Sequence, residues 1–320
     1  MLKKRTVSTK RSIIPGRFIL ILALALVFAG CAGTSRIRWP LTAGSPPEQH
    51  LLNPIPFFPQ KKYQCGPATL AMALEWSGIK VTPGELKPEV YTPSRKGSLQ
   101  SAMIAATRRH NRIAYLLPDP QALIDEVVAG HPVIVLQNLG LSWYPVWHYA
   151  VVVGLDLAKD NVILHSGETR CKELAVEVFE HTWARSDFWG LLVLPPSTLP
   201  ASARAYDYLR AVSDLERLGK YKTAAEAYRT ALNRWPNNLA AYMGLGVCRY
   251  ERGQLKSAEA VFREAAAKFP KDGAPYNNLA QVLMDQGRKA DALEAVEKAI
   301  ERGGPLKARF EDTLREIRRQ

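Results

Sequence analysis

The sequence is poor in residues that bind metals, and it lacks their usual spacings. Its 320 residues include four cysteines and six histidines, and neither a Cys-x-x-Cys nor a His-Glu-x-x-His motif occurs. Protein zinc sites commonly draw their ligands from such short spacings. We therefore predict that the protein uses neither a metal ion nor another cofactor.

Long hydrophobic runs are also scarce. The run FILILALALVFAG, residues 18–30, has thirteen residues, whereas a membrane-spanning helix needs roughly 20. The first thirty residues carry six basic side chains and no acidic one. A basic segment followed by a short apolar run is typical of an export signal. A plain secretory signal or an uncleaved anchor are the alternatives at this point.

The end of this run, VFAGC, resembles the bacterial lipoprotein box, in which small residues precede a cysteine that becomes the lipidated N-terminus. The resemblance implies that residues 1–31 are a lipoprotein signal peptide ending at lipidated Cys31. Ala32 follows in place of the Asp that is associated with inner-membrane retention. We therefore expect a lipid-anchored protein of the bacterial cell envelope, in the outer membrane and facing the periplasm. Residues 32–52, rich in Pro, Gly and Ser, are predicted to form a tether.

The positive charge of the chain does not predict nucleic-acid binding. The formal net charge is +13, but beyond residue 30 the chain has 37 basic and 30 acidic residues, a net charge of +7. No dense basic run interleaved with aromatic residues occurs there. Nucleic-acid binding normally requires such a concentrated basic surface. We therefore exclude nucleic acid as a partner.

Residues 53–197 show a mixed pattern of helices and strands. Helical periodicity with capping residues predicts three helices, and β-branched runs bounded by Gly, Asn, Asp or Pro predict four strands. Helices followed by strands indicate an α+β domain with a largely antiparallel sheet. The predicted helices span residues 66–78, 98–111 and 120–131; the strands span 132–139, 148–156, 161–166 and 188–195; and PPSTLPASA, residues 195–203, is the linker.

Residues 204–320 repeat with a period of 34. Small residues where helices cross and Pro at the end of a unit resemble the tetratricopeptide repeat. The resemblance implies an all-α array of three helical hairpins, followed by an amphipathic capping helix at about 306–319, which binds a protein partner. The repeated positions are Gly219, Gly253 and Gly287; Ala224, Ala258 and Ala292; Tyr228, Phe262 and Val296; Ala231, Ala265 and Ala299; and Pro236 and Pro270.

Three cysteines remain after Cys31, namely Cys65, Cys171 and Cys248. An odd number in an exported protein leaves at least one thiol free or bonded to another molecule. Cys65 stands at the start of a predicted helix, where free backbone N–H groups and the helix dipole favour an anion and lower the pKa of a thiol. We therefore interpret Cys65 as a nucleophile, which requires a histidine from elsewhere in the chain. His148 fits because it starts a predicted strand after a loop rich in aromatic residues.

These residues together resemble a known family. QKKYQCGPATLAM followed by HYAVVVG is similar to the papain-like cysteine peptidases of the double-glycine type, known as leader-cleaving domains of bacteriocin exporters. The resemblance implies a helix that carries the nucleophile, packed on an antiparallel sheet that carries the base. It assigns attack on the scissile carbonyl to Cys65, proton transfer to His148, and stabilisation of the oxyanion to the side-chain amide of Gln60. Gln64 is the other glutamine in this segment.

The family's third residue, an Asp after the next strand, is missing. NVILHS stands in its place and offers His165 or Ser166. Antiparallel neighbours would bring the end of this strand beside His148, and we predict that His165 orients His148. Asp156 and Asp160 are expected on the connecting turn.

Three functions are compatible with these features. The first is a membrane-anchored cysteine peptidase that hydrolyses a protein or peptide recruited by the repeats. The second is a non-catalytic lipoprotein scaffold with a degenerate peptidase fold, which the missing Asp favours. The third is a papain-like amidase or transpeptidase that acts on cell-wall peptides.

Overall fold

The computed structural model describes residues 49–52 and 54–319. The predictions for the signal peptide, for the lipid on Cys31 and for most of the tether lie outside this part of the chain. Within the described ranges, no helix is both long and apolar enough to span a membrane.

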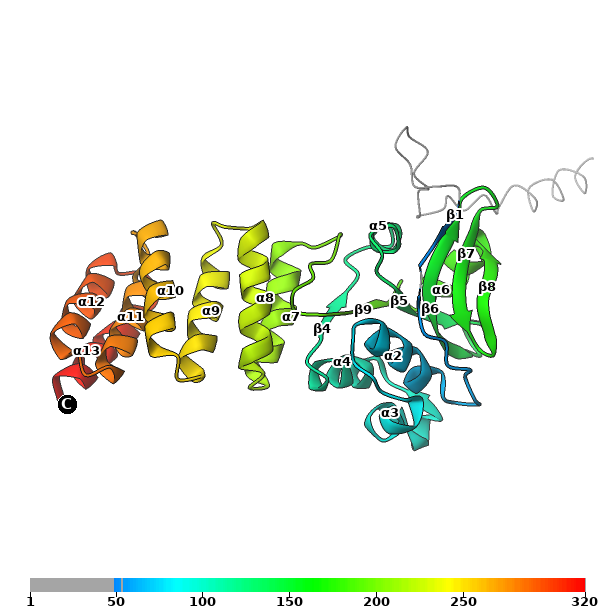
Figure 1. The fold of residues 1–320 in the computed structure, drawn as a ribbon, viewed down its shortest axis with the longest axis horizontal. Helices are drawn as coiled ribbons and strands as arrows, with labels where there is room; N and C mark the ends of the chain where they lie inside the picture. Colours follow the sequence, from blue (N-terminus) through cyan, green and yellow to red (C-terminus); the bar gives the residue numbers. More distant parts are fainter. Residues whose placement is uncertain (1–48, 53, 320) are drawn as a thin grey trace, which may run out of the picture. The chain divides into compact units, whose positions relative to one another are not determined.

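A seven-stranded sheet forms the framework of the first half of the chain, and its pairings are antiparallel. The strand order is β4-β9-β5-β6-β7-β8, with β1 added beside β6 (Figure 1). The strands are β1 (Gln49–Leu51), β4 (Ile113–Leu116), β5 (Val133–Asn138), β6 (Trp147–Asp156), β7 (Asn161–Ser166), β8 (Thr169–Ala175) and β9 (Gly190–Leu194). The predicted α+β class with an antiparallel sheet is confirmed.

Strand β6 is the longest and connects most of the sheet. Its first half pairs with β5, and its last three residues pair on that side with β1. Its other edge pairs with β7, with Val151 opposite His165. Because side chains alternate between the two faces of a strand, this register decides which side chains of β6 and β7 share a face.

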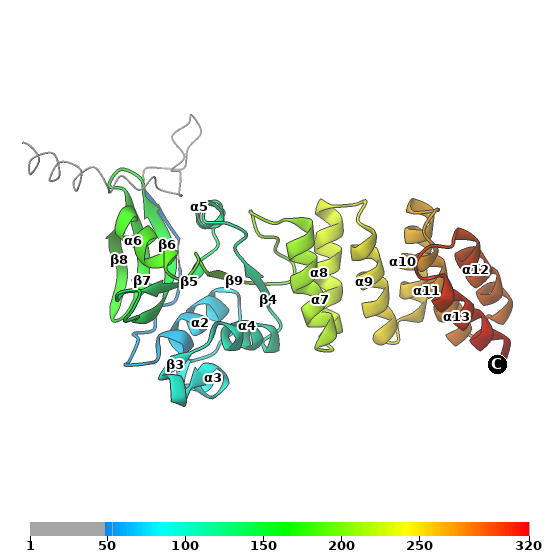
Figure 2. The ribbon, with the colours of Figure 1, turned by 180° about the vertical axis from the view of Figure 1, so that it is seen from behind.

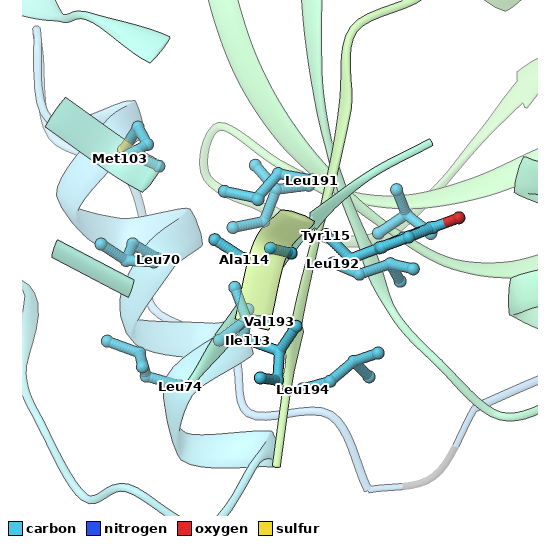
Figure 3. Packing of buried hydrophobic residues seen from close by; sticks show 14 of the residues in the cluster. Leu70, Leu74, Met103, Ile113, Ala114, Tyr115, Leu191, Leu192, Val193 and Leu194 are labelled. Atoms are coloured by element: carbon cyan, nitrogen blue, oxygen red, sulfur yellow. The ribbon is translucent and has the colours of Figure 1, made fainter. Parts of the chain in front are cut away.

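Helices α2 (Cys65–Trp76) and α4 (Gln100–Arg109) lie against the sheet, and α3 (Pro83–Val90) packs on these two helices (Figures 1 and 2). Nine of the twelve residues of α2 are buried, which explains its nearly continuous apolar sequence. Figure 3 shows part of the core, in which Leu70 and Leu74 of α2 join Met103 of α4 and side chains of β4 and β9. The short hairpin of β2 (Tyr91–Thr92) and β3 (Gly97–Ser98) connects α3 to α4.

The second half of the described chain consists of helices that follow one another as three hairpins and a final helix (Figure 1). Gly219, Gly253 and Gly287 separate the two helices of each hairpin at positive φ, which glycine adopts without strain. The helices are α7 (Ala205–Arg217), α8 (Tyr221–Arg234), α9 (Leu239–Glu251), α10 (Leu255–Lys268), α11 (Gly273–Asp285), α12 (Lys289–Arg302) and α13 (Lys307–Arg319).

The first repeat helix is joined to the sheet domain by packing and by polar contacts. Helix α7 packs against β4, and Arg108 of α4 forms an ion pair with Asp214 of α7. The carboxylate of Glu126, which is fully buried, accepts hydrogen bonds from the backbone N–H and the hydroxyl of Ser202 at 2.7 and 2.5 Å. The predicted linker, residues 195–203, is thus itself bonded to the sheet domain through Ser202.

The structure also contains elements that the sequence did not indicate. They are α3, β1, β4, β8, α6 (Val176–Ala184) and the β2–β3 hairpin. The helix predicted from Ser98 begins at Gln100 instead, and Leu99 occupies its N-terminal cap without a side-chain hydrogen bond. Ser98 belongs to β3, where it has a place in the candidate site.

Candidate active site

Cys65 is the first residue of α2 and follows a tight turn. Gln64 occupies the cap position and makes no side-chain capping bond, while Pro67 lies in the first turn, where no N–H is needed. Gly66 allows a close approach, since a Cβ on it would lie 2.2 Å from Ser98 Oγ. Cys65 therefore begins a helix whose first turn packs closely against Ser98 of the β2–β3 hairpin.

A groove of about 990 Å³ runs past the sulfur atom. The structure brings Gln60, Cys65 and His148 together in its lining, although His148 lies more than 80 residues after the segment that carries Gln60 and Cys65. His165 and Gln64 are not among the lining residues. The groove is also lined by Lys61, Lys62, Tyr63, Arg95, Lys96, Gly97, Ser98, Leu99, Gln100, Leu136, Tyr144, Pro145, Val146, Trp147, Tyr149, Gly167, Arg185, Ser186 and Asp187.

The electrostatics of Cys65 differ from the sequence prediction. Burial raises the pKa of the thiol above its ordinary value of 9.0, and this effect outweighs the backbone hydrogen bonds from Tyr149 and Gly66, which lower it. The helix start was expected to stabilise a thiolate, but desolvation of the charged form is stronger here. Cys65 is therefore a protonated thiol in the resting site at neutral pH.

His148 is neutral in the same resting site. Burial, together with the positive charge of Lys172, lowers its pKa to about 4. Its Nε2 lies 3.0 Å from Ser166 Oγ, at the end of the neighbouring strand β7. When Nε2–H donates to this hydroxyl, the lone pair of the imidazole resides on Nδ1, the atom that can accept the proton of a thiol.

His165 does not orient His148, contrary to the prediction. Its Nδ1 accepts the backbone N–H of Cys171 at 3.2 Å, and its Nε2 faces the carbonyl oxygen of Ile55 at 3.4 Å. His165 is paired with Val151, three residues after His148, so the alternation along a strand places the two imidazoles on opposite faces. Ser166, the alternative considered from the sequence, faces His148.

Gln60 is buried, with only 7% of its surface exposed. Among the described residues, neither the nitrogen nor the oxygen of its side-chain amide has a hydrogen-bond partner. Its backbone N–H is fixed by the carbonyl of Gly167 at 3.0 Å. A buried amide without partners is costly, and an oxyanion in the groove would provide the missing acceptor.

Two groove residues were not predicted from the sequence. The Oγ of Ser98 is buried without a hydrogen-bond partner in the described part of the chain. Tyr149 donates its hydroxyl to the Ser98 carbonyl at 3.2 Å, which ties the β2–β3 hairpin to the strand of His148. From the sequence, a Ser directly before a helix is expected to cap that helix. No sequence signal therefore indicated that Ser98 lines the groove.

The other sulfur and acidic groups do not form a second centre. Cys65, Cys171 and Cys248 are all free thiols, and Cys248 is buried inside α9. Asp156 and Asp160 lie at the β6–β7 turn, as expected, where Asp156 pairs with Lys159. No group of three His, Cys, Asp or Glu side chains in the described ranges is arranged to hold a metal ion.

This arrangement defines a class of protein: an α+β domain in which a helix-start thiol and a sheet imidazole line one groove. Comparison with models of known protein families identifies both parts of the chain more specifically than the fold and the groove do. Residues 52–188 match the Peptidase_C39 like family, and residues 209–273 and 249–305 match tetratricopeptide repeat models. The chain thus contains a C39-like peptidase domain followed by tetratricopeptide repeats, as predicted.

Solved structures similar to parts of the chain include one of each kind. A putative C39-like peptidase from Bacillus anthracis is 19% identical, with a TM-score of 0.40, covering 46% of this chain and 98% of that one. The type III secretion translocator chaperone SycD of Yersinia enterocolitica is 22% identical, with a TM-score of 0.34, covering 36% of this chain and 91% of that one. PcrH of Pseudomonas aeruginosa is 17% identical, with a TM-score of 0.34, covering 36% and 91%. No curated protein matches the chain significantly.

Proposed function

We propose that the protein is a cysteine peptidase that hydrolyses peptide bonds of a protein or peptide substrate. The observation that carries the proposal is the shared groove of Cys65, His148 and Gln60, in which the amide of Gln60 is buried and has no hydrogen-bond partner among the described residues. The match of residues 52–188 to a peptidase family supports the same reaction.

Because Cys65 is a protonated thiol and His148 is a neutral imidazole at rest, the reaction begins with a proton transfer between them. His148 accepts the thiol proton as Cys65 attacks the scissile carbonyl, and the negative charge moves to the carbonyl oxygen. The Gln60 amide and the backbone N–H groups at the start of α2 stabilise this oxyanion. The imidazolium then protonates the leaving amine, and water hydrolyses the thioester with His148 again as base.

The repeats and the N-terminal segment complete the proposal. The tetratricopeptide repeats bind a protein, which is either the substrate or a partner that presents it. The lipid on Cys31 anchors the chain to a membrane of the bacterial cell envelope, with both folded parts on the periplasmic side of the outer membrane. A lipid at this position rests on the lipoprotein-box sequence alone.

One observation favours the scaffold without catalysis as a second candidate. The raised pKa of Cys65 and the lowered pKa of His148 disfavour a thiolate–imidazolium pair, and Ser166 offers no charge to stabilise an imidazolium. A degenerate site of this kind would leave the repeats as the functional surface.

Comparison of new peptide N-termini distinguishes the two candidates. A mixture of peptides from a proteome digest is incubated with the wild-type chain, with Cys65→Ala and with the control Cys171→Ala. Catalysis predicts new N-termini with the wild type and the control that disappear with Cys65→Ala. An identical product set in all three samples would exclude the peptidase and leave the scaffold.

A further inference from the structure

The rim of the groove is strongly and asymmetrically charged. Five basic side chains line it, and one acidic side chain, Asp187, accompanies them. Four of the five lie in two pairs that flank the nucleophile: one pair precedes Cys65 on the chain, and the other precedes Ser98, which packs over the start of α2. The five are Lys61, Lys62, Arg95, Lys96 and Arg185.

The carboxylates of the described chain do not neutralise these charges. Lys61, Lys62, Arg95 and Lys96 are exposed and enter no ion pair with other described residues. Arg185 is directed to backbone carbonyls, those of Asn138 at 3.1 Å and Gly140 at 2.6 Å. Like charges held around one concave surface focus a positive potential into it.

The groove has a different character beside His148. Tyr144, Pro145, Val146 and Trp147 line it there, and the side chains of Tyr144 and Trp147 are 70% and 51% exposed. The side-chain oxygen of the nearby Asn138 accepts hydrogen bonds from the backbone N–H groups of Gly140 and Val146, which holds this loop in place. The groove therefore offers an apolar lining as well as cations.

We propose that the groove selects acidic peptide segments, with Asp or Glu side chains near the scissile bond and an apolar side chain against residues 144–147. Charge complementarity carries this inference: cations that form no ion pair with other described residues line the groove that contains the thiol, and an acidic substrate would supply the anions that pair with them. The proposal rests on the proposed peptidase function and names its substrate class. An anionic lipid surface is the competing occupant, and the position of the cations along the groove of Cys65 favours the peptide.

Binding by the inactive chain tests the selection without turnover. The probes are three fluorescein-labelled peptides of one apolar framework that carry four Glu, four Gln or four Lys, added to the Cys65→Ala chain and followed by fluorescence anisotropy. We expect the Glu peptide to bind at least ~10-fold more tightly than the Gln peptide, because each exposed ion pair contributes a fraction of a kcal/mol. Raising the salt from about 0.05 M to about 0.5 M should remove this preference.

A matched pair of variants locates the effect. Replacing Lys61, Lys62, Arg95 and Lys96 by Gln in the Cys65→Ala chain should abolish the preference for the Glu peptide. Replacing Lys256, Lys271, Lys289 and Lys307 by Gln removes the same charge from exposed positions of the repeats and should leave it intact. Equal loss in both variants, or no preference in the unsubstituted chain, would overturn the inference.

Two further measurements separate the inference from its alternatives. Vesicles with and without phosphatidylglycerol are offered to the same chains; binding to the anionic vesicles without preference for the Glu peptide would assign the cations to a lipid surface. In the catalytically intact chain, Asp and Glu should be enriched around the cleavage sites of the peptide mixture. Charge-dependent binding without any cleavage would refute the peptidase function but retain the preference for acidic peptides. Cleavage without enrichment of Asp and Glu around the cleaved bonds would retain the peptidase function and refute that preference.

Discussion

His148 Nε2 lies 3.0 Å from Ser166 Oγ. A hydroxyl therefore stands beside the imidazole, where the resemblance to double-glycine peptidases led us to expect the carboxylate of an Asp. A hydroxyl can accept the Nε2–H and fix the tautomer, but it carries no charge to stabilise an imidazolium. The pKa of His148, lowered to about 4 by burial and by Lys172, agrees with a site that orients its base without charging it.

Ser166→Asp should move the pH profile of kcat/KM. A carboxylate beside Nε2 favours the protonated imidazole and raises the pKa of His148 above about 4, so the acid limb of the profile shifts to higher pH. The rate above that limb should rise by roughly tenfold, because the imidazolium formed during attack is stabilised. Ser166→Ala should lower the rate without shifting the limb. A profile that is the same in all three chains would show that Ser166 does not act through His148.

Gln60→Ala should reduce kcat by about 100-fold or more with little change in KM, the expected result of removing an oxyanion donor. Gln64→Ala is the matched control, since Gln64 is adjacent on the chain but does not line the groove. Steady-state kinetics on one cleaved peptide measures both. If Gln64→Ala were the more damaging substitution, the assignment of the oxyanion donor would be reversed.

Stability should fall in acid partly through His148. Its pKa is about 4 in the folded chain and 6.5 ordinarily, so the unfolded chain binds the proton first as the pH falls. The folded state therefore loses up to about 3 kcal/mol between pH 6.5 and pH 4 through this group. Urea unfolding of wild type and His148→Gln at pH 7 and near pH 4.5 measures the effect.

The His148→Gln chain should show a smaller loss than the wild type. Burial also lowers the pKa of His165, which adds acid sensitivity to both chains and cancels in the comparison. Identical losses in the two chains would mean that His148 is solvated in the folded protein.

Gly66→Ala should destabilise the nucleophile's helix start. Its Cβ would lie 2.2 Å from Oγ and 2.5 Å from Cβ of Ser98, and overpacking of this kind costs about 1–3 kcal/mol. Gly84→Ala is the control, because its Cβ meets only Thr82 Oγ1 at 3.8 Å. Thermal unfolding measures the stability of both variants. Adding Ser98→Gly to the Gly66→Ala chain should restore part of the lost stability. No loss in Gly66→Ala would contradict the close packing of β3 on α2.

The sequence predicted those features that depend on local pattern. The 34-residue period identified the repeats because the same packing recurs in each hairpin, and the family models confirm them. The apolar runs of β5, β6, β7 and β9 predicted strands because both faces of these strands are buried. Strand β8 was missed because TRCKELA is mostly exposed and polar, so it lacks the pattern of a buried strand.

The details of the site depend on tertiary contacts that the sequence does not show. His165 and Ser166 are adjacent, and only the register of β7 against β6 determines which of them shares a face with His148. The position of Ser98 over Gly66 likewise requires the hairpin that folds back onto α2. The pKa of Cys65 is raised because burial, a property of the assembled groove, exceeds the local effect of the helix start.

Direct detection of an acyl-enzyme tests the central claim that Cys65 is the nucleophile. The p-nitrophenyl ester of a cleaved peptide is mixed with the wild-type chain, quenched in acid, and examined by intact and peptide mass spectrometry. Acylation of activated esters outpaces hydrolysis of the thioester, so the intermediate should accumulate with a burst of p-nitrophenol. We predict one acyl group on Cys65, absent from Cys65→Ala and much reduced in His148→Ala. Undiminished turnover by Cys65→Ala, with no acyl group on Cys65 of the wild type, would contradict the account.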